Sequence, residues 1–435
     1  MTEKTSRLKG FYKKSISERI QEIKEWADLT DDEVATLHKT LEPLGGESGN
    51  FFIENVVGVM QVPMGVATNF KVNGKDYLVP LAVEEASVVA AASNSAKVTL
   101  KHGGFHCTNA GPIMIGQIQC VNVADPFGAK FKILEIKDEI IAKANEQDPI
   151  LIKFGGGCKD LEVRVLDTMK GPMVVTHLIV NTGDAMGANA VNTMVEACAP
   201  LIERVTGGRV FLRILSNLAD RRVVRARAVF NKDELATEDM TGEQVVEGIL
   251  EAYAFAAADP YRAATHNKGI MNAISAITLA TANDWRAIEA GAHSYASRTG
   301  HYTSLTTYEK DKDGNLVGTI ELPLALGLVG GATRVHPIAK IAVKILGVKK
   351  ATELAEIVAS VGLAQNFGAM RALSTVGIQS GHMRLHLRNL AHQIVTDNND
   401  DPALVEKVME LVLKEKKGKI SMDMVEKAYK EAKSS

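Results

Sequence analysis

The sequence lacks the features that mark several large classes of protein. It has no stretch of about 18 or more uncharged apolar residues, so we expect no transmembrane helix. Its first residues, Met-Thr-Glu-Lys-Thr-Ser-Arg, contain no apolar segment of the kind that a secretory signal needs, and we therefore expect a cytoplasmic protein. The formal net charge is only −2, which gives no electrostatic reason to expect nucleic acid or an anionic membrane as a partner.

Cysteine, aromatic residues and one nucleotide-binding motif are also scarce or missing. The four cysteines, Cys107, Cys120, Cys158 and Cys198, form no C-x-x-C pair, and none lies near a histidine at zinc-finger spacing. We expect buried free thiols in a reducing compartment, with no metal site and no catalytic cysteine. Aromatic residues make up only 5% of the chain, which favours close packing of Ala-rich and Gly-rich helices over a β-sandwich. No G-x-G-x-x-G occurs, so the sequence does not support a Rossmann domain.

The length, the hydrophobic content and the order of the expected elements indicate a globular protein of mixed structure. The 435 residues, 46% of them hydrophobic, suffice for two or three domains. After Gly103-Gly104, expected strands alternate with an expected helix near 134–145, which is typical of an α/β unit. The strands are expected near 113–123, 161–166 and 173–180. We therefore predict an α/β (α+β) fold, with a small α/β unit at 110–218 inserted into a large helix-rich domain at 1–109 and 219–376.

The end of the chain reads as a separate helical flap. Gly377 and Gly381 flank an expected hinge, and three helical segments lie beyond it. The segments, 382–396, 402–417 and 421–433, are polar and have little apolar content to bury. Low local contact density is what a mobile lid requires, so we predict a small flap over 377–435.

The stretch from Asp259 to Asn272 carries an unusual density of polar side chains between two apolar helical runs. Arg262 can bind a carboxylate or a phosphate, and Lys268 can stabilise a developing oxyanion. These residue types favour a site for an anionic substrate that carries a carbonyl group. A solvated connection between helices with ordinary surface charges explains the same residues equally well.

Two acidic positions and one loop are further candidates. Glu85 lies where an expected strand meets a helix, and Asp284 precedes the helix that starts at Trp285; either carboxylate can simply serve the helix start. The loop from Asp184 to Asn189 joins a strand to a helix. The backbone N–H groups at such a helix start suit a pyrophosphate, and a tight strand-to-helix turn is the alternative.

These stretches and three others together resemble the signature set of one enzyme family. In chain order they are Glu54-Asn55-Val56-Val57-Gly58, Val83-Glu84-Glu85-Ala86-Ser87, Asp184-Ala185-Met186-Gly187-Ala188-Asn189, the 259–272 stretch, the 283–293 stretch, Gly327-Leu328-Val329-Gly330-Gly331-Ala332-Thr333, and Gly381-His382-Met383-Arg384-Leu385-His386. The set resembles that of 3-hydroxy-3-methylglutaryl-CoA (HMG-CoA) reductase, in its soluble class II branch. Because the motifs keep the family's order over most of the chain, the likeness is far more specific than any one of them.

The resemblance implies a reaction and residues that perform it. The family interconverts HMG-CoA with mevalonate plus coenzyme A by two hydride transfers, through mevaldyl-CoA hemithioacetal and mevaldehyde. By this likeness Lys268 would stabilise the hemithioacetal oxyanion, His382 would protonate the departing thiolate, and Glu85 would protonate the mevaldehyde oxygen. Asp284 would link Lys268 to Glu85. Ala86 stands where the family usually has Pro, which changes the start of the helix and not the chemistry.

The resemblance also implies the ligands. The nicotinamide cofactor would bind a non-Rossmann domain at Asp184, Ala185, Met186, Gly187 and Asn189. Asp148 aligns with an acidic residue that contacts the adenosine ribose in NAD-preferring relatives. Because an acid there would repel a 2′-phosphate, we expect NAD rather than NADP.

Polar partners for the hydroxymethylglutaryl group would be Ser87, Asn217, Arg262 and Asn272. The family's active site forms between subunits, with the 54–58 motif near the contact, so we expect a homodimer or an assembly of dimers. Two other functions fit part of the pattern. A CoA-thioester lyase or hydratase would use the same acid, base and lysine without hydride transfer, and the loop at Asp184 argues against it. A non-catalytic CoA-binding protein would not need all four catalytic residues.

Overall fold

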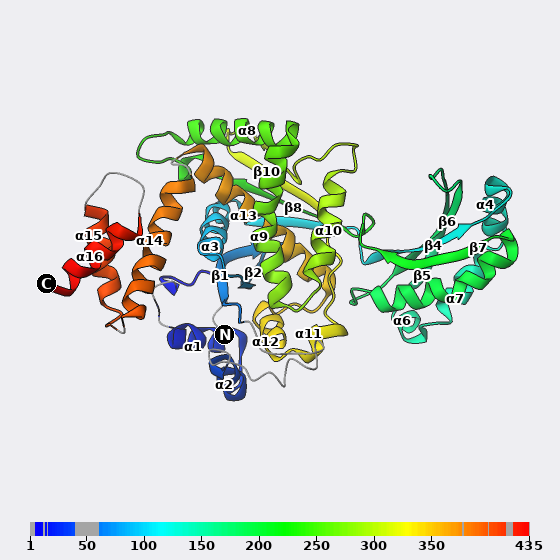
Figure 1. Ribbon diagram of the computed structural model, residues 1–435, viewed down its shortest axis with the longest axis horizontal. Coiled ribbons are helices and arrows are strands. Elements are labelled where there is room, and N and C mark those ends of the chain that lie inside the picture. The colour runs from blue at the N-terminus through cyan, green and yellow to red at the C-terminus, as the bar shows by residue number, and fades with distance from the viewer. Residues whose placement is uncertain are drawn as a thin grey trace.

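The computed structural model describes residues 5–11, 14, 16–39, 61–375, 378–398, 400–414 and 421–434. A six-stranded sheet with long helices forms its centre (Figure 1). A four-stranded sheet with its own helices lies at one end, and the last helices of the chain lie at the other. This mixture of helices and sheets confirms the predicted fold class.

The central sheet has the strand order β2-β1-β3-β8-β10-β9. Its strands are β1 (Met64–Val72), β2 (Lys75–Ala82), β3 (Phe105–Asn109), β8 (Val223–Phe230), β9 (Thr306–Lys310) and β10 (Leu316–Pro323). The hairpin between β1 and β2 turns at Asn73 and Gly74, whose φ values of 48° and 83° suit the two-residue turn that Asn-Gly predicts. β1 contains a bulge between Ala67 and Phe70 and continues past it as one strand.

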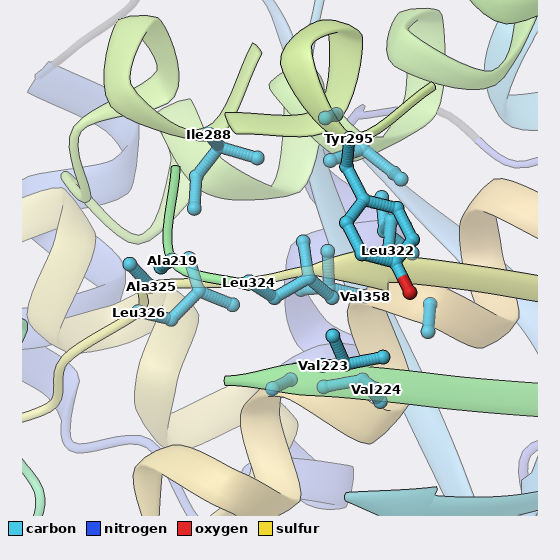
Figure 2. Packing of buried hydrophobic residues seen from close by; sticks show 14 of the residues in the cluster. Ala219, Val223, Val224, Ile288, Tyr295, Leu322, Leu324, Ala325, Leu326 and Val358 are labelled. Carbon is cyan, nitrogen blue, oxygen red and sulfur yellow. The ribbon is translucent and has the colours of Figure 1, made fainter. Parts of the chain in front are cut away.

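Long helices rich in small residues pack on this sheet. They are α3 (Val88–Thr99), α8 (Gly242–Ala258), α9 (Pro260–Ala280), α10 (Trp285–Ala296) and α13 (Ala351–Ser374). At Gly362 of α13 an added Cβ would lie 2.7 Å from Cδ1 of Ile274 of α9, so glycine permits these two helices to approach closely. Figure 2 shows the core beneath α10, where Leu322 lies beside Tyr295 and Ile288 lies farther along the same helix.

The polar stretch is helical from Pro260 to Asn272, which excludes its interpretation as a connection between helices. Asp259 caps α9 by accepting a hydrogen bond from the N–H of Arg262 at 3.0 Å, and the proline that follows needs no partner at that position. Ile270 is fully buried while Lys268 is exposed. The polar groups therefore share a helix whose remaining face belongs to the core.

The second sheet has the order β5-β6-β4-β7, and all of its strands pair antiparallel. Its elements are β4 (Ile113–Val121), α4 (Pro126–Glu135), α5 (Lys137–Asn145), α6 (Pro149–Lys153), β5 (Gly157–Leu166), β6 (Met173–Asn181), α7 (Ala188–Thr206) and β7 (Arg209–Ser216). The single helix expected near 134–145 is two helices that meet at Ile136. Helices α4, α5 and α7 pack against the sheet, and the antiparallel pairing makes this unit α+β.

The last three helices are α14 (Ile378–Asp397), α15 (Leu404–Lys414) and α16 (Met422–Ser434). They have a core of their own, which includes Leu387, Val408 and Val425. This corrects the expectation that they have little to bury: their apolar residues recur at helical spacing and so gather on facing sides. Gly381, expected beside a hinge, lies inside α14, and Gly377 lies outside the described residues.

Near the N-terminus, α1 (Ile16–Ala27) and α2 (Asp31–Lys39) pack on α12 (Pro337–Leu346) through a small apolar cluster that includes Ile23 and Ile341. Across the described ranges, no helix is both long and apolar enough to cross a membrane. The four cysteines are unpaired, and three of them are buried.

Candidate active site

Glu85 and Lys268 form an ion pair although 183 positions separate them in the sequence. Glu85 lies between the end of β2 and the start of α3, and Lys268 projects from α9. Their Oε2 and Nζ atoms are 3.2 Å apart, with the two side chains 37% and 64% exposed. Because water screens so exposed a pair, the contact adds little to stability. The structure thus brings together an acid and a cation that remain accessible to a ligand.

The predicted substrate residues lie at different distances from this pair. Asn272 follows Lys268 by one helical turn and therefore lies on the same side of α9. Ser87 precedes α3 with φ 77°, a left-handed conformation that is uncommon for a residue with a side chain, and it makes no capping hydrogen bond. Arg262 lies six residues before Lys268, about 120° away around the helix. Burial lowers the pKa of Arg262.

Asp284 does not meet Lys268 within the chain. Its carboxylate accepts a hydrogen bond from the N–H of Ala287 at 3.1 Å, as the N-cap of α10, and forms an ion pair with Arg286 at 3.3 Å. The twelve residues from Lys268 to the end of α9 at Ala280 span about 18 Å at the helical rise, which two extended side chains do not bridge. The expected link from Asp284 to Lys268 and Glu85 is therefore absent within one copy of the chain.

The loop that begins at Asp184 is fixed to the large part of the molecule. The carboxylate of Asp184 accepts a hydrogen bond from the N–H of Ala351, the first residue of α13, at 2.7 Å. Its backbone carbonyl accepts one from the N–H of Leu328 at 2.9 Å. The side chain of Asp184, predicted to contact a cofactor, thus caps a distant helix in this structure.

The remainder of that loop leaves the start of α7 open. Gly187 is the N-cap of α7 with φ 104°, and no side chain caps the helix there. An added Cβ at Gly187 would lie 2.3 Å from Cγ2 of Thr182, so only glycine fits. Asn189, in the first turn, is exposed. An uncapped helix start with its dipole directed outward suits a pyrophosphate, so the residues present fit a dinucleotide.

Two further predicted ligand residues lie on or beside the small sheet. Asp148 is the N-cap of α6: its Oδ1 accepts a hydrogen bond from the N–H of Leu151 at 2.8 Å. The structure therefore gives Asp148 a local role alongside the predicted contact with a ribose. Asn217 is exposed just after β7. An added Cβ at Gly291 would lie 2.6 Å from the carbonyl oxygen of Asn217, so the backbone of Asn217 lies close against α10.

A groove of about 2190 Å³ follows the exposed face of α3. Glu85 and Ser87 line it before the helix, and Asn94, Lys97 and Lys101 line it farther along. Arg7, Lys9 and Arg371 also line it, so most of the charged residues in an otherwise largely apolar lining are cations. These cations were not predicted as site residues, although the three-residue spacing of Asn94 and Lys97 on α3, with Lys101 four residues farther on, is a usable signal.

A buried polar network anchors α9 beside Lys268. His266 is 2% exposed, and burial together with the charge of Arg262 lowers its pKa to about 3. Its Nε2 lies 3.1 Å from the amide nitrogen of Asn366, in α13. Asn267, fully buried, donates to the carbonyl of Thr303 at 2.9 Å. This face of α9 is therefore fixed, which directs Lys268 to the open side.

Two of the predicted motifs are described only in part. Residues 54–58, expected near a subunit contact, lie outside the described residues. His382 and His386 belong to helix α14, and their side chains also lie outside what the structure describes. The predicted role of His382 stays a prediction.

Comparisons with known proteins agree on one family. A family model described as Hydroxymethylglutaryl-coenzyme A reductase matches residues 15–387. The 3-hydroxy-3-methylglutaryl-coenzyme A reductase of Archaeoglobus fulgidus is 57% identical over 419 residues, which cover 96% of this chain and 93% of that protein. The probable 3-hydroxy-3-methylglutaryl-coenzyme A reductase of Borreliella burgdorferi is 34% identical, with 90% of this chain and 88% of that protein covered.

Solved structures give the same result. The class II 3-hydroxy-3-methylglutaryl-CoA reductase from Streptococcus pneumoniae, bound to NADPH in open conformations, matches with a TM-score of 0.80 and 42% identity. That match covers 84% of this chain and 99% of the solved one. Another structure of the Streptococcus pneumoniae enzyme matches with a TM-score of 0.81 and 39% identity, and covers 97% of this chain and 99% of that one.

Proposed function

This chain belongs to the hydroxymethylglutaryl-coenzyme A reductase family, and we propose that it interconverts HMG-CoA with mevalonate and coenzyme A by two hydride transfers with NAD(H). The route passes through mevaldyl-CoA hemithioacetal and mevaldehyde. One observation carries the proposal: the Glu85–Lys268 pair, at 3.2 Å, lies on the lining of a long groove. Two successive carbonyl reductions need a cation for the oxyanion and an acid for the alcohol, and this pair provides both.

Lys268 and Glu85 have distinct roles in the proposal. The ammonium of Lys268 stabilises negative charge that develops on the carbonyl oxygen at each reduction. The carboxyl group of Glu85 is placed to pass a proton to the mevaldehyde oxygen as the alcohol forms. The contact between them orients both groups toward one reacting oxygen. Ser87 and Asn272, close to the pair in the fold, bind the polar end of the hydroxymethylglutaryl group.

The coenzyme A portion extends along α3. A thioester of coenzyme A is long and bears its phosphates far from the reacting carbon. The groove has this form, because Glu85 lies near the start of α3 and Lys97 lies about 15 Å farther along the helix. Lys101 and Arg371 extend the cationic lining toward the phosphates. His382, on α14, protonates the thiolate that leaves.

The nicotinamide cofactor binds at the start of α7. The bound group supplies and accepts the hydride. Gly187 and the uncapped first turn of α7 bind its pyrophosphate, and Asp148 accepts from the ribose hydroxyls through the oxygen that does not cap α6. The relative from Streptococcus pneumoniae is described as bound to NADPH, which supports a dinucleotide of this kind. For this chain we propose a preference for NAD(H), because the charge of Asp148 disfavours a 2′-phosphate.

The complete site requires a second copy of the chain. Lys268 and Glu85 pair within one copy, whereas Asp284 follows α9, whose end at Ala280 is about 18 Å from Lys268 along the helix, on the side where the loop of Asp184 and Gly187 lies. A homodimer that places Asp284 and the cofactor of the partner beside the pair unites all of the predicted groups. A two-fold interface forms two such sites.

The three parts of the chain divide these tasks. Residues 1–109 and 219–376 bind HMG-CoA, residues 110–218 bind the nicotinamide cofactor, and residues 377–435 form the flap that carries His382. The separate core of α14, α15 and α16 supports this division, because those helices can move as a unit.

The test is nicotinamide absorbance with the purified protein, in both directions and with both cofactors. One direction starts from HMG-CoA and the other from mevalonate plus coenzyme A. We expect turnover with NAD(H) well above that with NADP(H). A preference for NADP(H) would overturn the role of Asp148 alone, and no turnover with either cofactor would overturn the reaction.

A further inference from the structure

Arg222 is a buried cation without an ion-pair partner among the described residues. It directly precedes β8 and is 4% exposed. Burial lowers its pKa to about 10. A guanidinium removed from water needs compensation from several acceptors, and an unpaired buried charge is unusual unless it has a task.

The acceptors of Arg222 belong to two separate segments. Nη1 lies 3.0 Å from Oγ1 of Thr182 and donates to the carbonyls of Ala185 at 3.3 Å and Met186 at 3.2 Å. Nη2 donates to the carbonyl of Leu326, just beyond β10. The planar fork of a guanidinium reaches both segments at once, which the single ammonium of a lysine does not.

The bond to Met186 has a consequence for the loop it fixes. In a trans peptide the C=O and the following N–H point in opposite directions. Because the carbonyl of Met186 faces Arg222, the N–H of Gly187 is directed away from it. That N–H finds no acceptor within the described part of the chain. Arg222 thus orients an N–H without an acceptor at the start of α7, in a glycine that is itself buried.

The segment at Leu326 continues toward Asp284. The next residue, Gly327, donates its N–H to Oδ1 of Asn283 at 2.8 Å, and Asn283 directly precedes Asp284. An added Cβ at Gly327 would lie 2.5 Å from the backbone nitrogen of Met186, so the two segments are in close contact. Arg222 lies between the loop of Gly187 and the segment that fixes Asp284.

We propose that Arg222 is a positioning residue that holds the 182–187 loop in its cofactor-binding form and keeps that loop in register with Asp284. The inference rests on the proposed function, since it assigns the dinucleotide to this loop. The inference requires the planar geometry of the guanidinium, and not only its positive charge. Neither Arg222 nor its backbone acceptors need touch the reacting atoms.

Binding of NADH, followed by tryptophan fluorescence, tests the inference without turnover. The chain has two tryptophans, Trp26 and Trp285, and Trp285 is adjacent to Asp284. In a Trp26→Phe background, bound NADH quenches Trp285 by energy transfer. We expect Arg222→Met to weaken NADH binding about 10- to 100-fold, because several bonds to a charged group are lost. Arg222→Lys should remain weakened about tenfold or more, since it keeps the charge without the fork.

Arg221→Met is the matched control. Arg221 is the adjacent arginine, is exposed and pairs with Glu162, so its loss should change NADH binding by less than about twofold. Calorimetric binding of HMG-CoA, which should be unchanged in every variant, shows that each one is folded. If Arg222→Met fails to bind HMG-CoA, Thr182→Val replaces it; that change removes one buried acceptor of Arg222, and we expect about three- to tenfold weaker NADH binding.

The outcomes separate the two levels of proposal. Equal NADH binding by the Arg222→Met and Arg221→Met variants would overturn the positioning role, as would unchanged binding by Thr182→Val. If Arg222→Lys restores NADH binding fully, the positive charge of residue 222 holds the loop and the planar guanidinium is not needed. If the parent protein binds HMG-CoA but no NADH, the proposed function itself is wrong.

Discussion

The amide nitrogen of Asn366 lies 3.1 Å from Nε2 of His266, and the two side chains belong to one buried polar cluster. The amide oxygen of Asn366 accepts from the hydroxyls of Tyr308 at 2.8 Å and Thr306 at 3.0 Å. Oγ1 of Thr306 and Oγ of Ser304 also lie 2.7 Å and 2.8 Å from Nε2, so this ring nitrogen has three polar neighbours. Nδ1 is buried without a partner among the described residues. A second proton would have to enter a site built for a neutral ring.

The first prediction concerns stability at acidic pH. Burial holds the pKa of folded His266 at about 3, below the ordinary value of 6.5, so the unfolded chain binds a proton that the folded chain does not. This contribution to stability is fully present above pH 6.5 and is lost as the pH falls toward 3, by up to about 1.4 kcal/mol per pH unit. Urea unfolding at pH 4.5 to 7.5 measures the slope. In His266→Gln, which keeps an acceptor near the position of Nε2, the unfolding free energy should depend less on pH than in the parent. In His106→Gln, at an exposed site, its dependence on pH should match that of the parent. An unchanged slope in His266→Gln would contradict the assignment.

The second prediction separates the steps of the reaction. Lys268→Ala should lower every half-reaction by about 100- to 1,000-fold, because the same cation serves both reductions. His382→Ala should lower conversion of HMG-CoA by about 100-fold or more and spare reduction of free mevaldehyde, which releases no thiolate. Lys312→Ala, in the exposed hairpin between β9 and β10, is the control. Equal loss of mevaldehyde reduction in the Lys268 and His382 variants would show that the thiolate role is wrong.

The third prediction tests cofactor choice with two equivalent helix caps. Asp148 and Asp125 both accept from a first-turn N–H, in α6 and α4, and both precede a proline. Alanine at either site should lower the unfolding free energy by about 1 kcal/mol. Only Asp148→Ala should also raise kcat/KM for NADP(H) relative to NAD(H), by about tenfold. Steady-state kinetics with both cofactors measure this ratio of kcat/KM values. An unchanged ratio in Asp148→Ala would show that Asp148 only caps its helix.

The fourth prediction concerns the second copy of the chain. If Lys268 acts with Asp284 of the partner subunit, the Lys268→Ala and Asp284→Ala proteins are each inactive but form one intact site when mixed. After unfolding and refolding together, about half of the dimers are mixed and each has one site, so about one quarter of the parent activity should return. If both groups came from one subunit, no combination would contain an intact site and the mixture would stay inactive.

The sequence predicts local features well because local physics decides them. Local signals set the bounds of α8 and α12: the capping box of Thr241 and Gln244 starts the first, and Gly347, with φ 68°, ends the second. Asp284 is the N-cap that its position predicts. The helical conformation of the polar stretch on α9 is not evident from its sequence, because its buried and exposed positions are both polar.

Distant contacts are not encoded in any short pattern. The carboxylate of Asp184 caps a helix 167 positions away. Arg221 and Arg222 are adjacent and chemically identical, yet one is exposed and the other buried. Nothing in their local sequence distinguishes them, because the carbonyls that surround Arg222 come from two other segments. The same holds for the separation of Lys268 from Asp284, which follows from the uninterrupted length of α9.

Helix α13 has a mechanical consequence. It extends about 36 Å through the core, its first N–H is bound to Asp184, and α14, which carries His382, packs against it. A closely packed helix is displaced as a rigid body and bends little along its length. It therefore connects the loop of Asp184 to α14 as one rigid element, so a displacement of that loop would shift the start of α14 as well. The hydrogen bond from Ala351 to Asp184 therefore also fixes the point at which the loop joins the helix.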